Sequence, residues 1–566
     1  MIAPDPSGSS PSRSLSDARL TALVALALFA LAAWPLLLVD LPPYQDLPNH
    51  VATAHIIAHP DIYPQYVFNG LFKSNALLTL WFHLFGGLGL FGAARAFTAV
   101  VLAVNAIALP VFVLRFAGRR ALLAATLFAW PLVHSFSITM GFLNFAFAFA
   151  LSLILLAVLD QQRERPTAAR GVAIAVLAGV LWYAHPFPLA VVGALVAAHA
   201  LTRATWPARL AAGVALLLPL APTALLSVIS AQQHLVKSAG RPDLAGAPFS
   251  FLNPWENLAH LWTDVSGALT RAGSMTIVPA LLLPWFAWRH RVDGARLRLA
   301  ESVAGGSGNP PRVPVSNRHA ARPFLSLPAM AVLLAAYVGL PEMLSNWHYL
   351  NCRLVPFLWA GLLVRLPATL PRPIAIVLAV AALSFSAVTG VDYVRLDRDR
   401  AAFTAGIDAV PQRATLLPLL FKHRQTSVFT ASLTHAWGYY TVEKNASAPL
   451  VFAVERSYPI TYREFPPASL IPPALDRTAE LCGTPDNACK FFGQFALDAA
   501  CTDIWSDFWS AFWHDAEPRF SHLLTWAMPP EARPMIPRRY RRVFAAGDLE
   551  IYARDAVTPA APAPHQ

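Results

Sequence analysis

The residues best suited to chemistry lie in one polar stretch near the N-terminus, VDLPPYQDLPNHVATAHIIAHPDIYPQYVFNGLFKSN, which begins at Val39. Within it, Asp46 lies between prolines and shortly before Asn49 and His50. A carboxylate held in this way could act as a general base or orient an acceptor group. Asp40 offers a second carboxylate six residues earlier. We therefore expect Asp46 to carry a function, with Asp40 as the next candidate.

The same stretch carries two further histidines. Residues 49–59 favour a short helix, which would place His55 and His59 one turn apart on the same face. Such a pair together with a carboxylate could ligate a metal ion. The simpler interpretation, which we favour, is that both are polar residues at a membrane surface. No metal ligand is assigned, and a divalent metal stays open as a cofactor.

Arg353 ends the polar segment PEMLSNWHYLNCR and leads directly into the apolar run LVPFLWAGLL. A guanidinium at the head of an apolar helix either extends to the membrane surface or meets an anionic partner, because burying it alone is costly. Bidentate binding of a lipid phosphate is the functional alternative. Both interpretations have equal weight. The remaining candidates for lining a site or contacting an acceptor are Asn49, His50, His348 and Glu256.

The composition shows what kind of chain must position these residues. Of the 566 residues, 56% are hydrophobic and 13% are charged, whereas soluble domains carry about 25% charged residues. This excludes a soluble enzyme and a disordered protein. The net charge of +11 comes from short basic clusters between apolar runs, a pattern typical of cytoplasmic loops and not of a nucleic-acid-binding face. The fold class is therefore a polytopic α-helical membrane protein without a nucleic-acid partner.

About eleven apolar runs are long enough to cross a bilayer, which takes about 20 helical residues. The predicted spans are 20–39, 93–114, 121–138, 141–159, 171–185, 187–202, 210–227, 273–288, 324–340, 354–366 and 373–390. With residues 1–19 as a disordered cytoplasmic N-terminus, the basic clusters all fall on the cytoplasmic side.

The transmembrane domain then covers residues 20–390, with outer loops at 40–92 and 228–272 and a cytoplasmic loop at 289–323. Residues 76–90 decide this topology, because every later assignment would invert if they crossed the membrane. They are short and rich in glycine at their end, so we expect an interfacial or re-entrant helix on the outer face.

Residues 391–566 differ in character and predict a soluble α/β domain on the outer side. Charge rises and apolar runs shorten to strand length. We expect strands at 415–421, 427–430 and 450–454, a helix or strand at 435–444, and a hairpin over 540–554 that turns at Gly547 and Asp548. The tryptophans Trp505, Trp509 and Trp513 recur every four residues and predict a core stripe. A disulfide between Cys482 and Cys489 is a further expectation.

Several of these motifs resemble the GT-C superfamily of integral-membrane glycosyltransferases. The first helix, the acidic outer loop and the short apolar segment LWFHLFGGLGLFG before Arg95 are similar to that family. More narrowly, YQDLPNHVA, GFLNFAFAFALSL and CRLVPFLWAGLL look like a bacterial group that carries D-x-P-N-H. The resemblance implies that Asp46, or else Asp40, activates the acceptor and that Arg353 holds the donor's phosphate.

The function implied by this resemblance is transfer of a sugar from a polyprenyl-phosphate donor to a glycan, lipid or protein acceptor. It also implies a bacterial inner membrane, with membrane lipids as partners, a cytoplasmic N-terminus and a periplasmic C-terminal domain. Two alternatives stay open: a non-catalytic scaffold or subunit of cell-envelope polysaccharide assembly, and a secondary transporter. Transporters usually carry internal repeats and ionisable residues within their spans, and neither is evident in this sequence.

Overall fold

The computed structural model divides the chain into two compact units. The first comprises residues 1–42, 71–85 and 92–393, and the second comprises residues 43–70, 86–91 and 394–566. The structure describes residues 11–202, 205–238, 251–258, 261, 275–304, 324–343, 349–423, 431–454, 458–471, 475, 479–480, 482–492 and 501–555. His348 and the strand expected at 427–430 lie outside the described residues.

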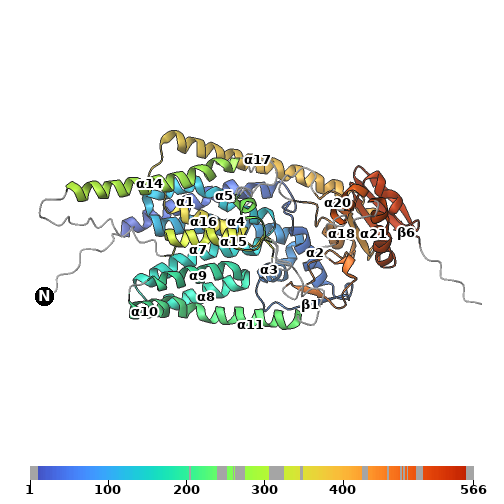
Figure 1. Cartoon of the computed structure of the whole chain (residues 1–566), viewed down its shortest axis with the longest axis horizontal. Coiled ribbons are helices and arrows are strands. Elements are labelled where there is room, and N and C mark those ends of the chain that lie inside the picture. Colours follow the sequence, from blue (N-terminus) through green and yellow to red (C-terminus); the bar gives the residue numbers. More distant parts are fainter. Residues whose placement is uncertain are drawn as a thin grey trace, which may run out of the picture. The chain divides into compact units, whose positions relative to one another are not determined.

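The first unit is helical (Figure 1). Its α-helices are α1 (Pro11–Ala33), α3 (Leu77–Phe85), α4 (Leu90–Ala117), α5 (Arg119–Val133), α6 (Phe136–Thr139), α7 (Leu143–Glu164), α8 (Ala168–Ala184), α9 (Pro186–Leu201), α10 (Trp206–Leu217), α11 (Ala221–Ser238), α14 (Ile277–Ala304), α15 (Leu327–Gly339), α16 (Val355–Leu363) and α17 (Arg372–Thr404), the last of which ends among residues of the second unit. Local signals fix several starts: α9, α10 and α15 each have a proline in the first turn, and the Ser326 hydroxyl accepts a bond from Ala329 N.

Six helical stretches among the described residues are long and apolar enough to cross a membrane. They are Ser16–Leu37, Leu90–Ala117, Arg119–Thr139, Leu143–Glu164, Trp206–Ser230 and Arg372–Ala409. Shorter apolar helices cover Leu77–Leu88, Ala168–Ala184, Pro186–Leu201, Leu327–Gly339 and Cys352–Leu363. The predicted helical membrane protein is confirmed at this level, while the number of eleven spans stays a prediction.

The segment that decides the topology forms the nine-residue helix α3, followed by the short 3-10 helix Gly86–Leu88. Nine residues of α-helix rise about 14 Å, roughly half of the about 30 Å of hydrocarbon in a bilayer. The nine-residue helix α16 within the predicted span 354–366 is equally short, so the interfacial or re-entrant position of residues 76–90 stays a prediction.

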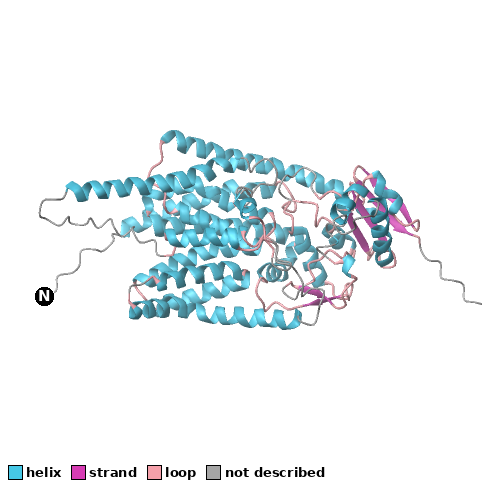
Figure 2. Cartoon of the chain, viewed as in Figure 1, coloured by secondary structure: helices cyan, strands magenta, loops and turns pink. Residues whose placement is uncertain are grey.

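The second unit contains a four-stranded sheet in the order β2-β4-β6-β5 (Figure 2). Its strands are β2 (Leu416–Leu420), β4 (His522–Trp526), β5 (Tyr540–Ala546) and β6 (Leu549–Arg554). β2 and β4 are parallel, and the other neighbours are antiparallel. The hairpin expected over 540–554 is present, and Gly547 takes the positive φ of 57° that its turn requires. A two-stranded sheet pairs β1 (Tyr66–Phe68) with β3 (Ile460–Tyr462).

Two strand expectations meet different outcomes in the structure. Residues 435–444 contain the helix α18 (Gly438–Lys444), one of the two alternatives left open. The strand expected at 450–454 was wrong. There the side chain of Asn49 bonds the backbone: Asn49 Nδ2 donates to Leu450 O and Phe452 N donates to Asn49 Oδ1. One backbone bond from β3, Tyr462 N to Ala453 O, does not extend into a ladder.

The core of the second unit packs helix α21 (Cys501–Ala516) against the sheet. Trp509 and Trp513 are buried together with Leu417 of β2 and Leu523 of β4, and Trp505 is packed against this cluster. The tryptophan stripe is therefore core, as its spacing predicted. The same cluster includes Ala52 and Ile56 of α2 (Leu47–Ala58). Residues 43–70, expected as an outer loop of the membrane domain, thus share a core with the C-terminal region.

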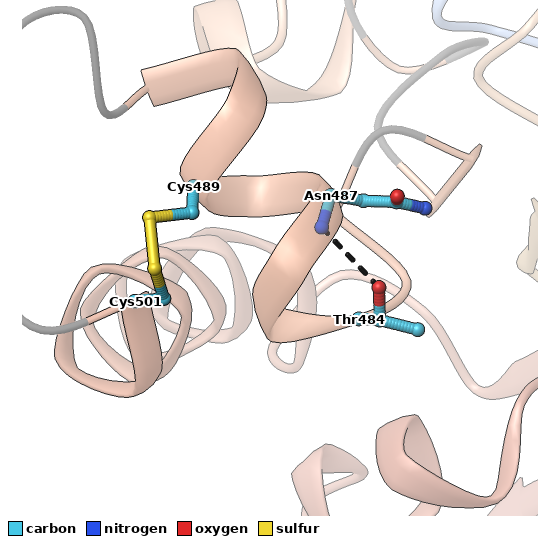
Figure 3. Close-up of a disulfide and its surroundings, with 4 residues drawn as sticks. All are labelled: Thr484, Asn487, Cys489 and Cys501. Carbon is cyan, nitrogen blue, oxygen red and sulfur yellow. Dashed lines mark hydrogen bonds between the residues drawn. A yellow bond between two sulfur atoms is a disulfide. The ribbon is translucent and has the colours of Figure 1, made fainter.

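A disulfide joins helix α20 (Pro485–Phe492) to helix α21, between Cys489 and Cys501 (Figure 3). The expected pairing of Cys482 with Cys489 was wrong. Cys482 is a buried free thiol, and its carbonyl oxygen accepts bonds from the indole nitrogens of Trp505 and Trp509. Cys482 is therefore part of the core, while Cys501 at the start of α21 is the residue that reaches α20.

Candidate functional site

Asp46 lies at the N-terminus of α2, and the neighbouring prolines fix its backbone. Its carbonyl oxygen accepts the first bond of the helix from His50 N at 3.1 Å, while its carboxylate makes no capping bond. The carboxylate instead contacts His435 of the second unit, with 3.5 Å between Asp46 Oδ1 and His435 Nε2. Asp46 is only 9% exposed, so the sequence-predicted candidate is a buried carboxylate beside an imidazole.

Asn49 fastens this region from one turn further along α2. It is fully buried, and its amide bonds the backbone of residues 450 and 452. The same Nδ2 lies 3.3 Å from His435 Nδ1, and Thr53 Oγ1 donates to Asn49 Oδ1. Asn49, expected to line the site, therefore connects α2 to His435.

Two imidazoles next to Asp46 are neutral at pH 7. Burial lowers the pKa of His50 to about 4. Burial, together with the neighbouring His50 and His423, lowers the pKa of His435 to about 3. Both rings pack edge-on against Phe452, with ring centroids 5.9 Å apart for His50 and 5.0 Å for His435. The imidazole that contacts the Asp46 carboxylate, that of His435, is therefore a neutral group.

His55 and His59 do lie together on α2, as the spacing predicted. Their ring centroids are 4.3 Å apart, His59 Nδ1 bonds the carbonyl oxygen of His55, and His55 Nε2 bonds Asn445 Oδ1. Within the described residues, no group of three or more His, Cys, Asp or Glu side chains is spaced to hold a metal ion. Hydrogen bonds inside the protein account for both rings.

Arg353 belongs to the first unit, where a 3-10 turn (Cys352–Leu354) precedes α16. The guanidinium is 7% exposed and lies above the rings of Phe142 and Phe145, 4.9 and 5.4 Å from their centroids. Its Nη1 lies 2.7 Å from His185 Nε2, and its Nε donates to Tyr349 O at 3.3 Å. Arg353 is thus enclosed by aromatic and neutral polar groups, and does not extend into solvent.

The other two candidates lie in exposed positions. Asp40 is exposed. Glu256 is exposed, and its carboxylate accepts a bond from Asn253 N, as a residue near a helix start does. Its neighbour Asn257 is buried. Asn351 Nδ2 donates to Asn257 Oδ1, and Tyr337 donates to the carbonyl oxygen of Asn257.

Three side chains have surroundings that the sequence did not indicate. His435 carried no local signal, because its partner Asn49 on α2 is 386 residues away in the sequence. Lys73 counted only as part of the polar stretch, but it is buried, and burial lowers its pKa to about 7. His185 is packed against Phe145 and also contacts Arg353.

Comparisons with known proteins give one kind of likeness. No protein-family model matches the chain, and no curated protein matches it in sequence. Two solved structures of ArnT from Cupriavidus metallidurans are similar to it in fold. The structure bound to undecaprenyl phosphate has a TM-score of 0.48 and 12% identity, covering 95% of this chain and 98% of that chain. The apo structure has a TM-score of 0.42 and 14% identity, covering 96% and 98%.

Proposed function

We propose that this chain is a membrane glycosyltransferase that moves a sugar from a polyprenyl-phosphate donor to a hydroxyl group of an extracytoplasmic acceptor. The observation that carries this proposal is the buried Asp46 carboxylate, held at the start of α2 and faced by the neutral imidazole of His435. A base for a sugar or lipid hydroxyl needs a carboxylate that is held in a fixed position.

The reaction assigns one role to each of the two principal candidates. The acceptor oxygen forms a bond to the anomeric carbon, the bond from that carbon to the phosphate oxygen breaks, and polyprenyl phosphate leaves with the electron pair. Asp46 accepts the proton of the acceptor hydroxyl. Arg353 binds the donor phosphate and stabilises the negative charge that develops on it. Asp40 is the alternative base, and His50, His348 and Glu256 are the candidates for acceptor contacts.

The cellular placement belongs to the same proposal. The chain is placed in a bacterial inner membrane with its N-terminus in the cytoplasm and residues 391–566 in the periplasm. The Cys489–Cys501 disulfide supports this orientation, because disulfides form and persist in oxidising compartments and are rare in the cytosol.

The experiment is glycan and glycolipid profiling of a deletion strain complemented with variants of the gene. We expect Asp46→Asn to lower the product about 100-fold or more, since general base catalysis contributes about 10²–10⁴-fold. Arg353→Ala should abolish it through loss of donor binding. Asp61→Asn and Arg372→Ala remove an exposed charge of the same type, and both should restore the wild-type glycan.

Two outcomes contradict the proposal in different ways. Full complementation by Asp46→Asn at wild-type expression removes Asp46 as the base and leaves Asp40. A deletion strain whose glycans and glycolipids are unchanged removes the transferase activity itself and leaves a scaffold or a transporter.

A further inference from the structure

The orientation of the Asn49 amide follows from the backbone that it touches. Phe452 N can only donate, so the atom that it meets at 3.3 Å is the amide oxygen. Leu450 O can only accept, so the atom that it meets at 3.1 Å is the amide nitrogen. Exchanging the two ends of the amide would set donor against donor and acceptor against acceptor, in a side chain that is fully buried. Only one orientation of Asn49 is compatible with residues 450–452.

This orientation decides which nitrogen of His435 carries the proton. The amide nitrogen of Asn49 is 3.3 Å from His435 Nδ1, and an amide NH2 group donates. Nδ1 must therefore accept, and a neutral imidazole then carries its hydrogen on Nε2. Nε2 is the atom that faces Asp46 Oδ1 at 3.5 Å. A series of contacts thus fixes the proton: the backbone of Leu450 and Phe452 orients Asn49, and Asn49 orients His435. As a result, the Nε2–H group of His435 points toward the Asp46 carboxylate.

We propose that Asn49 and His435 are positioning residues, which present a fixed N–H donor to Asp46 and so keep its carboxylate ionised and aimed at the acceptor. This inference rests on the proposed function, in which Asp46 is the base. The separation of 3.5 Å is longer than a hydrogen bond, and such contacts commonly shorten when substrate binds. Among the described residues, His50 on α2 and His423 are titratable groups that act on His435, and His423 lies 3.8 Å from Glu480.

Two substitutions of similar polarity separate positioning from packing. In His435→Gln, the terminal amide nitrogen reaches the place of Nε2, so the donor toward Asp46 is kept. In His435→Asn, the shorter side chain reaches only the place of Nδ1, so the donor is lost. We expect His435→Gln to keep the rate of glycan formation within about fivefold of wild type. We expect His435→Asn to lower the rate about 10- to 100-fold, measured in detergent-permeabilised membranes of the complemented deletion strain.

A pH profile of the same rate provides a readout that packing alone would not move. Loss of a donor to the ionised carboxylate favours its protonated form, so the acidic limb of the profile should move to higher pH in His435→Asn and stay in place in His435→Gln. Equal rates in both variants, or an equal loss with an unmoved acidic limb, would overturn the inference. A wild-type protein that forms no glycan product overturns the proposed function instead, and this inference with it.

A second measurement needs no substitution. In protein labelled with ¹⁵N-histidine, the shifts of His435 should report a protonated Nε2 and an unprotonated Nδ1 near neutral pH. The opposite tautomer would contradict the orientation derived from Asn49, whatever the variants do.

Discussion

At Lys73, burial changes the chemistry of a side chain that the sequence presents as an ordinary charge. Its pKa falls from 10.5 to about 7 because the ammonium is removed from water. The neutral amine is the form that reacts with acylating reagents, so the reactivity of Lys73 should reach half its maximum near pH 7. Competitive labelling across pH 5–11, with peptide mass spectrometry, measures this value. Lys73→Arg identifies the peptide, and a midpoint near 10.5 would contradict the prediction.

The lowered pKa of Lys73 also determines how the stability of the folded protein changes with pH. Between about pH 7 and 10.5 the unfolded chain binds a proton at this lysine that the folded chain does not. Folding stability from Lys73 therefore rises with pH through this window and is lowest where the amine is charged in both states.

The sequence could indicate single residues only where their signal is local. Asp46 and Asn49 stand out because prolines and a histidine surround them within seven residues. His435 could not be selected in the same way, because it belongs to the candidate site only through its contact with Asn49, which is 386 positions away in the sequence. Lys73 and Arg353 illustrate the same limit: the sequence shows their charge, but burial and neighbours depend on the folded chain.

Among the elements, α2 and α18 approach each other through a glycine. A Cβ atom at Gly438 would lie 2.5 Å from Pro48 O and 3.0 Å from its carbonyl carbon, closer than such atoms can pack. Gly438→Ala should therefore push α18 away from the start of α2 and destabilise the second unit by about 1–3 kcal/mol. Because Pro48 lies two residues after Asp46, the rate of glycan formation should fall as well.

Thermal unfolding followed by fluorescence, together with the glycan assay, tests this prediction. Gly87→Ala is the matched control, since a Cβ atom there meets nothing within 4 Å. If Gly438→Ala left the stability and the rate unchanged, α2 and α18 could separate without a loss of unfolding free energy. The distance between the two helices would then have no effect on the activity assigned to Asp46.

Elements were predictable in proportion to their length. The backbone hydrogen bonds of a long apolar helix all lie within the helix, so the composition of a run such as Leu143–Glu164 is enough to predict it. Short strands depend on partners that lie elsewhere in the chain. The runs LVFAV at 450–454 and HLLTW at 522–526 are equally short and the first is the more apolar, yet only the second joins a sheet, between β2 and β6. The first is bonded by the side chain of Asn49 and by one backbone bond from Tyr462 of β3.

For the whole molecule, the orientation in the membrane depends on the parity of the spans. In the proposed topology α3 does not cross, Arg115, Arg163 and Arg289 are assigned to cytoplasmic helix ends, as the positive-inside rule favours, and residues 391–566 are assigned to the outside. We expect alkaline phosphatase fused after residue 566 to be active. Green fluorescent protein at the same position should be dark, because it does not mature after export in unfolded form. The opposite pattern would mean an inverted or miscounted topology.

The disulfide provides a readout of the same orientation without a fusion. On the periplasmic side, Cys489 and Cys501 should be recovered as one cross-linked peptide pair, while Cys482 is alkylated only after unfolding. In a strain without periplasmic disulfide catalysis, the same pair should become reduced, and α20 should lose its attachment to α21. Cys482→Ser serves as the control, since it should leave the cross-link intact. A pair that is reduced in wild-type cells would place this unit in the cytosol, where the proposed acceptor chemistry at Asp46 could not take place.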